Sequence, residues 1–240
     1  MPEKKNVLVI CHTSAGQMYM GVLLNRIWYK PVLVKTAEEG ILYAKNTPFS
    51  LIMLDGDMPE QDRKAVLSLL RNDLAVRHLP LVVFVTGENA KSCEALVAQG
   101  CSAVITKPID VALVYAVLGR LCNQPRQTPR TQTRFRVEIE EQTPERFLTC
   151  INLSEGGIYL RAHSPLPERT LLHLKFTLPR DTEEIEVIGE VVRTEPLSAE
   201  LLAEPGMGIS FVKLSEETRI RFRNFVQWEL IGDLEWEATI

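Results

Sequence analysis

The chain has 240 residues, of which 45% are apolar and 24% are charged, and its formal net charge is −4. This composition is ordinary for a folded chain, and the length allows one or two domains. We expect a cytoplasmic protein without membrane insertion, because no apolar run could span a bilayer, the N-terminus has no secretory pattern, and the five cysteines are scattered without paired spacing.

Five apolar runs typical of buried parallel strands occur in the first half of the chain, at 6–10, 32–34, 51–54, 81–85 and 103–105. Helix-length segments alternate with these runs, at about 15–28, 37–46, 60–72, 90–99 and 109–122. This alternation predicts a doubly wound α/β domain over residues 1–122 with a five-stranded parallel sheet. The functional residues of such a sheet should follow the apolar runs, at the carboxyl ends of the strands.

Polar residues stand at three of these strand ends. Asp55 follows the third apolar run, Thr86 ends the fourth, and Lys107 follows the fifth. With the Met-Pro pair that comes soon after Asp55, residues 5–122 resemble the receiver domain of two-component response regulators, which has a flavodoxin-like fold. The resemblance implies that Asp55 is a phospho-acceptor, that Thr86 senses the phosphoryl group, and that Lys107 pairs with it.

The same domain departs from receivers at two places. Receivers hold Mg²⁺ on an acidic pair after the first strand, whereas this chain has Cys11 and His12 there, and neither is a good ligand for a hard cation. Asp55 and Asp57 serve as magnesium ligands only if the ion binds at all. Val104 stands where receivers carry an aromatic switch residue. We therefore predict a degenerate receiver used for docking or dimerisation, with live phosphorylation of Asp55 as the alternative.

The second half of the chain has a different pattern. Residues 123–133 contain almost no apolar side chain, which predicts a linker that is flexible without ligand. In the second domain, 134–240, short runs with strand character predict a six-stranded β-barrel closed by a C-terminal helix. Five of these runs lie at 135–140, 157–160, 171–176, 185–193 and 206–211. The helix should begin after Ser215 as its N-cap, with an apolar face that includes Ile220, Phe225, Val226 and Leu230.

Two polar clusters stand near the start of the barrel. The first is an RxxxR pattern and the second an NxSxGG pattern, formed by Arg130 and Arg134 and by Asn152, Ser154, Gly156 and Gly157. An arginine fork can bind a phosphate or a guanine edge with paired hydrogen bonds. The amide and the hydroxyl suit the polar groups of guanine, and the glycines allow positive φ and a close approach of ligand to backbone.

These clusters and the barrel pattern around them resemble the PilZ family over most of residues 125–232. The resemblance implies that the barrel binds the bacterial second messenger cyclic di-GMP through the six residues of the two clusters. Arg126 and Arg136 are additional candidates. Arg126 and Arg130 also form an RxxxR pattern, but Arg134 directly precedes the first apolar residue of its strand, as the second arginine of the family does.

Charge is unevenly distributed along the chain. Residues through 122 hold 13 Lys/Arg and 11 Asp/Glu, and the remainder holds 14 and 20. Four arginines nevertheless fall within 126–136. A short basic strip beside an acidic barrel suits a small dianion, whereas a long nucleic acid needs a broad basic face. We therefore expect no nucleic-acid partner.

The patterns and the two resemblances together predict a cyclic di-GMP effector of bacterial signalling that acts on a protein partner in motility, adhesion or biofilm control. Ligand binding would order the linker and change the orientation of the domains. Two alternatives stay open: a phosphorylation-dependent response regulator with a PilZ output, and a PilZ interaction protein that binds no nucleotide. The receiver resemblance also leaves a homodimer open. We expect no enzyme, because no nucleophile–base pair or metal cluster occurs beyond the receiver-like site.

Overall fold

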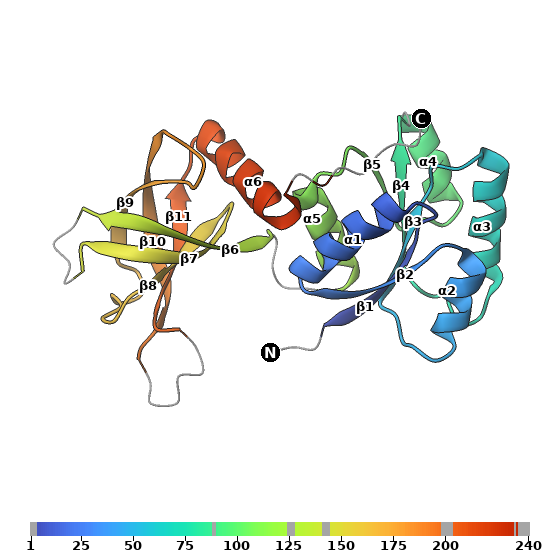
Figure 1. Cartoon of the computed structure of the whole chain (residues 1–240), viewed down its shortest axis with the longest axis horizontal. Helices are drawn as coiled ribbons and strands as arrows, with labels where there is room; N and C mark the ends of the chain where they lie inside the picture. The colour runs from blue at the N-terminus through green and yellow to red at the C-terminus, as the bar shows by residue number, and fades with distance from the viewer. Residues whose placement is uncertain are drawn as a thin grey trace. The chain divides into compact units, whose positions relative to one another are not determined.

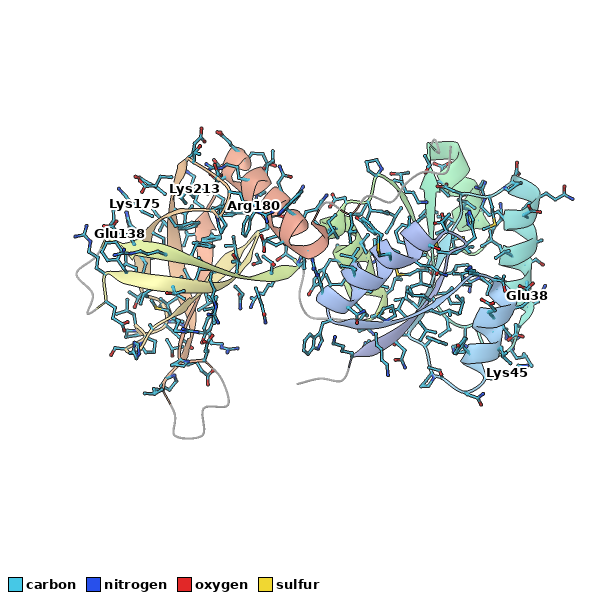
Figure 2. The ribbon with its side chains drawn as sticks, in the orientation of Figure 1. Glu38, Lys45, Glu138, Lys175, Arg180 and Lys213 are labelled. Carbon is cyan, nitrogen blue, oxygen red and sulfur yellow. The ribbon has the colours of Figure 1, made fainter. Side chains whose placement is uncertain are left out.

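The computed structural model describes residues 4–87, 90–123, 128–140, 145–197, 204–232 and 234. The chain forms two compact units that divide between Gln127 and Thr128, and the residues from Leu230 onward are grouped with the first unit. Figure 1 shows the elements of both units in chain order. Charged side chains such as Glu38 and Lys45 lie on the periphery of the first unit (Figure 2).

The first unit is the predicted doubly wound α/β domain. Its five strands are all parallel, in the order β2-β1-β3-β4-β5, and helices α1 and α5 lie on the opposite face of the sheet from α2, α3 and α4 (Figure 1). The elements are β1 Lys5–Ile10, α1 Ser14–Arg26, β2 Tyr29–Val34, α2 Ala37–Ala44, β3 Leu51–Asp55, α3 Glu60–Asn72, β4 Leu81–Thr86, α4 Ala90–Ala98, β5 Ala103–Lys107 and α5 Val111–Leu121.

Local sequence explains where several of these helices begin. The side chains of Thr13, Thr36 and Asp110 accept hydrogen bonds from backbone N–H groups in the first turns of α1, α2 and α5, which would otherwise lack a partner. The central strands are buried on both faces, as strands of a parallel sheet covered by two helical layers must be. This framework brings the carboxyl ends of β1, β3, β4 and β5 together at one edge.

The second unit is the predicted closed barrel, with strands in the order β10-β11-β8-β7-β6-β9. One strand, β7, includes the Asn152–Ser154 segment and lies outside the runs identified in the sequence. It was missed although Leu148 and Cys150 are buried and alternate with exposed residues, a pattern typical of a strand. The elements are β6 Arg130–Ile139, β7 Phe147–Ser154, β8 Gly157–Arg161, β9 Leu171–Thr177, β10 Glu184–Glu195, β11 Gly206–Lys213 and α6 Glu216–Ile231.

Two details of this unit differ from expectation. Strand β6 begins at Arg130 rather than at 135, because Thr131 turns its side chain into the barrel and is only 5% exposed. In α6, Ser215 caps the helix as expected, accepting a hydrogen bond from the Thr218 N–H at 3.0 Å. Ile220, however, is 46% exposed, and Phe222 is fully buried in its place, stacked on Phe211.

Among the described helices, none has both the length and the apolar character that crossing a bilayer requires.

Candidate functional site

A depression of about 520 Å³ lies in the barrel wall where β6 pairs with β7, and its lining joins the two clusters found in the sequence. The pairing of β6 with β7 shifts register between Gln132 and Phe135, and that of β7 with β8 shifts between Cys150 and Asn152. Such irregularities bend a strand and redirect side chains. The residues in and beside them line the depression: Gln132, Thr133, Arg134, Ile151 and Asn152, together with Glu204.

Arg134 and Asn152 are therefore brought together by the structure. Asn152 is paired with Gln132 on one side and with Tyr159 on the other. Arg134 is exposed, and no hydrogen bond or ion pair within the described ranges engages its guanidinium. A flat, permanently charged donor group thus stands at the mouth of the depression beside an amide that can both donate and accept.

The remaining cluster residues are placed differently. Arg130 starts β6 opposite Ser154 and is exposed, but it does not line the depression. Ser154 is only 3% exposed, and its Oγ donates to the carbonyl oxygen of Gly157 at 3.1 Å. The hydroxyl proton is therefore used to close the turn between β7 and β8, and only the oxygen remains to accept a hydrogen bond.

The expectation that the two glycines supply positive φ is wrong, because Gly156 and Gly157 are not among the residues with positive φ. Gly157 is required for another reason: a Cβ at this position would lie 2.4 Å from the carbonyl oxygen of Ile209 on β11. Gly156, by contrast, has nothing within 4 Å of such a Cβ and is exposed. The first glycine leaves the turn open, and the second lets two strands approach closely.

Of the two additional arginines, Arg136 does not line the depression. Arg136 lies on the exposed side of β6, with its guanidinium 3.6 Å from the centre of the Phe147 ring. Such stacking is a cation–π contact, which accounts for this side chain without a ligand. Arg126 lies outside the described residues.

Sequence reasoning missed two sets of contacts around the clusters. Glu155, within the NxSxGG turn, forms ion pairs with Arg219 at 3.5 Å and with Arg223 at 3.2 Å, both on α6. The four-residue spacing of the two arginines on one helix face was the available signal. On β8, Arg161 forms an ion pair with Glu204, and the Tyr159 hydroxyl donates to the Glu204 carbonyl oxygen at 2.7 Å. No sequence pattern indicated this second set.

The receiver-like unit has its own polar cluster at the carboxyl edge of the sheet. The Lys107 Nζ lies 2.8 Å from an oxygen of Asp55 and 2.8 Å from an oxygen of Asp57. The lysine side chain is 5% exposed and that of Asp55 is 2% exposed. Cys11, in the place of a receiver's acidic residue, donates its thiol to the second oxygen of Asp55 at 3.3 Å. His12 is exposed.

Asp57 uses both of its carboxylate oxygens within this cluster. One accepts from the Thr86 backbone N–H at 2.7 Å, and the other accepts from the Thr86 hydroxyl at 2.6 Å and from Lys107. Burial opposes ionisation of Asp57, but the hydrogen bonds from Lys107 and Thr86 prevail and lower its pKa. Burial, with a smaller effect of the Asp55 charge, raises the pKa of the Cys11 thiol.

The cluster does not combine ligands for a metal. Within the described ranges, no group of three or more His, Cys, Asp and Glu side chains could hold an ion. A thiol with a raised pKa and two carboxylates already bound to a lysine are a poor donor set for Mg²⁺, which requires oxygen ligands. The residues present therefore do not fit the magnesium site of a receiver.

Comparison with known proteins finds similarity in both halves of the chain. Residues 124–228 match the model of the PilZ domain. The polar-differentiation response regulators DivK of Brucella ovis and of Brucella anthropi are each 29% identical to this chain over 108 residues, which cover 45% of this chain and 87% of the relative.

Two solved structures are similar to part of this chain. The chemotaxis response regulator CheY4 of Vibrio cholerae has 17% identity and a TM-score of 0.44, covering 49% of this chain and 98% of that one. The receiver domain of the sensor histidine kinase PA1611 from Pseudomonas aeruginosa, with a magnesium ion in its active-site cleft, has 18% identity and a TM-score of 0.44, covering 50% and 98%.

Proposed function

We propose that this chain, in which a receiver-like domain precedes a PilZ domain, is a bacterial cyclic di-GMP effector that binds the nucleotide in the depression between β6 and β7. The observation that carries the proposal is the convergence of Arg134 and Asn152 at the strand irregularities, inside the segment that matches the PilZ domain.

The chemistry of the depression fits such a ligand. Its volume of about 520 Å³ lies within the usual range for small-molecule sites. Arg134 can bind a phosphodiester or the guanine O6 and N7 atoms with two parallel hydrogen bonds. Asn152 can donate and accept at the guanine edge, and the exposed Gly156 lets a ring approach the backbone. Arg130, at the start of β6, would hold the second charge of the dianion.

The linker before β6 is the part of the chain that we propose to respond to ligand. Arg130 and Arg134 lie in the first half of β6, directly after the linker. Charge-assisted hydrogen bonds from both arginines to the nucleotide would therefore fix the residues that precede β6. We propose that this changes the orientation of the domains and the surface offered to a protein partner. Limited proteolysis tests the step: cleavage around 123–129 should slow when cyclic di-GMP is added, and unchanged cleavage would refute it.

We further propose that the receiver-like domain serves for docking rather than phosphoryl transfer. Thr86 and Lys107 are the groups that would receive a phosphoryl group on Asp55, and Asp57 already accepts hydrogen bonds from both. An internal carboxylate therefore occupies the donors that a phosphorylated receiver uses.

Phosphorylation of Asp55 is the second candidate, favoured by the 2.8 Å pair of Asp55 with Lys107 and by the similarity to DivK. Incubation with acetyl phosphate and Mg²⁺ distinguishes the two, with Asp55→Asn as the control. We expect no label on either protein, and label on the wild type alone would establish phosphoryl transfer.

Calorimetric titration of the full chain with cyclic di-GMP tests the main proposal. Arg134→Ala should weaken binding about 10- to 100-fold, since one charge-assisted hydrogen bond contributes about 1.5–3 kcal/mol. Arg136→Ala is the matched control, because this neighbouring exposed arginine stacks on Phe147 and should leave the affinity unchanged. Absence of binding by the wild type would instead support a PilZ domain that acts only through protein contacts.

A further inference from the structure

We propose that Glu204 competes with the nucleotide for Arg161. Without ligand the carboxylate of Glu204 forms an ion pair with Arg161, and on binding the guanidinium of Arg161 moves to the nucleotide. The inference rests on the proposed function, and it adds Arg161 and Glu204 to the residues that set the affinity of the same site.

The position of Glu204 is fixed by two contacts. Its carboxylate forms an ion pair with Arg161, and its carbonyl oxygen accepts a hydrogen bond from the Tyr159 hydroxyl at 2.7 Å. Tyr159 is largely buried and lies directly opposite Asn152 in the pairing of β7 with β8. Glu204 is thus held against β8, the strand that follows the NxSxGG turn.

Arg161 is within reach of the depression for the same reason. It follows Tyr159 by two residues on β8, and because side chains alternate between the faces of a strand, the two point to the same face. Its guanidinium bonds to Glu204, which itself lines the depression with Arg134 and Asn152. We therefore expect that Arg161 exchanges the carboxylate of Glu204 for a phosphodiester of the ligand by a rotation of its side chain.

The balance of charge gives the direction of the exchange. Without ligand, Glu204 is an acidic group in the wall of a site proposed for a dianion, and Arg161 neutralises it. The side chains of this pair are 37% and 44% exposed, and an ion pair so open to solvent contributes little stability. A phosphodiester offers Arg161 a bidentate partner in a more enclosed place. Glu204 should consequently weaken nucleotide binding without stabilising the fold.

Calorimetric titration of the full chain with cyclic di-GMP tests this reasoning. Glu204→Gln keeps the shape of the side chain and removes its charge, so it should tighten binding about two- to fivefold, as expected for one exposed charge pair. Arg161→Ala should weaken binding, and Glu204→Gln should gain less affinity in the Arg161→Ala background than in the wild type, because the competition for Arg161 is then absent and only the direct repulsion of the dianion by Glu204 is relieved. Glu195→Gln, at a glutamate paired with Arg193 at 3.3 Å outside the lining, is the control and should leave affinity unchanged.

The outcomes separate this inference from the function on which it rests. If the wild type binds and Glu204→Gln binds equally or more weakly, the competition is refuted while the nucleotide site stands. A gain from Glu204→Gln that is as large without Arg161 as with it refutes the transfer of this arginine. If neither the wild type nor Glu204→Gln binds, the proposed function fails and this inference fails with it. A thermal unfolding midpoint that Glu204→Gln leaves unchanged without ligand excludes a change in fold stability as the source of a gain.

Discussion

Replacement of Lys107 by Met tests how strongly the receiver-like unit depends on its buried charges. Lys107 is the only cation that the described contacts place against both Asp55 and Asp57, at 2.8 Å from each. Methionine preserves most of the volume of the side chain but leaves two neighbouring carboxylates without their counter-ion.

The expected loss follows from the burial of the cluster. The Lys107 and Asp55 side chains are 5% and 2% exposed, so water cannot replace the missing ammonium group. Removal of one partner from a buried ion pair costs about 3–5 kcal/mol. Lys175 provides the control, because it also contacts two carboxylates, those of Glu140 at 2.7 Å and of Glu186 at 2.9 Å. Unlike Lys107, its side chain is 28% exposed on the barrel surface (Figure 2). Solvent screens such a pair, and Lys175→Met should change the stability of the barrel little.

Hydrogen exchange of the full chain, followed by mass spectrometry, separates the two units. Lys107→Met should accelerate exchange in β3, β4 and β5 by about 100-fold or more, the factor that corresponds to a loss of about 3 kcal/mol. Exchange in the barrel should not change, and it serves as the internal reference. Equal and small effects of Lys107→Met and Lys175→Met would refute the argument that burial decides the strength of these pairs.

Two further predictions concern the glycine turn and the pH dependence of the receiver-like unit. Gly157→Ala should destabilise the barrel by about 1–3 kcal/mol, because the new methyl group meets a main-chain carbonyl oxygen of β11. Gly156→Ala should leave the urea unfolding midpoint unchanged, since nothing lies near its new methyl group. Equal midpoints for the two variants would contradict the packing argument. Burial raises the pKa of Asp57, but the hydrogen bonds from Lys107 and Thr86 lower it by more. The pKa of Asp57 in the folded protein therefore lies below its value in the unfolded chain. The stability that it contributes is therefore present above about pH 4 and is lost as the pH falls through the folded pKa. Thermal unfolding between pH 7 and pH 3 should show a shallower loss for Asp57→Asn than for the wild type, and identical slopes would contradict the assignment.

Much of the receiver-like unit followed from the sequence. Its apolar runs alternate with helix-length segments, and that pattern alone fixes a parallel sheet with polar residues at one edge. The pairing of Lys107 with Asp55 agrees with the receiver resemblance. The part played by Asp57 did not follow, because a carboxylate two residues after a strand end can face solvent, a metal or a lysine, and only the distances to Thr86 and Lys107 distinguish these cases.

The barrel was predicted with less detail. Its six-stranded closed form and its C-terminal helix were correct, but no run was identified at β7, although buried Leu148 and Cys150 alternate there with exposed residues. The buried face of α6 was misplaced at Ile220 because Phe222 fits the helical period with Phe225 and Val226 equally well from sequence. The ion pairs of Glu155 and of Glu204 join residues more than 40 positions apart. The spacing of Arg219 and Arg223 indicates one basic helix face but not the carboxylate that it contacts, and no local pattern indicates the pair of Glu204 with Arg161.

The order of residues by itself determined the two fold types and the kinds of side chain available at each strand end, because hydrophobic periodicity and turn chemistry are local properties of the chain. The tertiary structure alone decided which of those side chains are buried, which carboxylates are neutralised, and which arginine stands open beside an amide. Those properties depend on distances between segments remote in sequence and on the exclusion of water, and both exist only once the strands have paired.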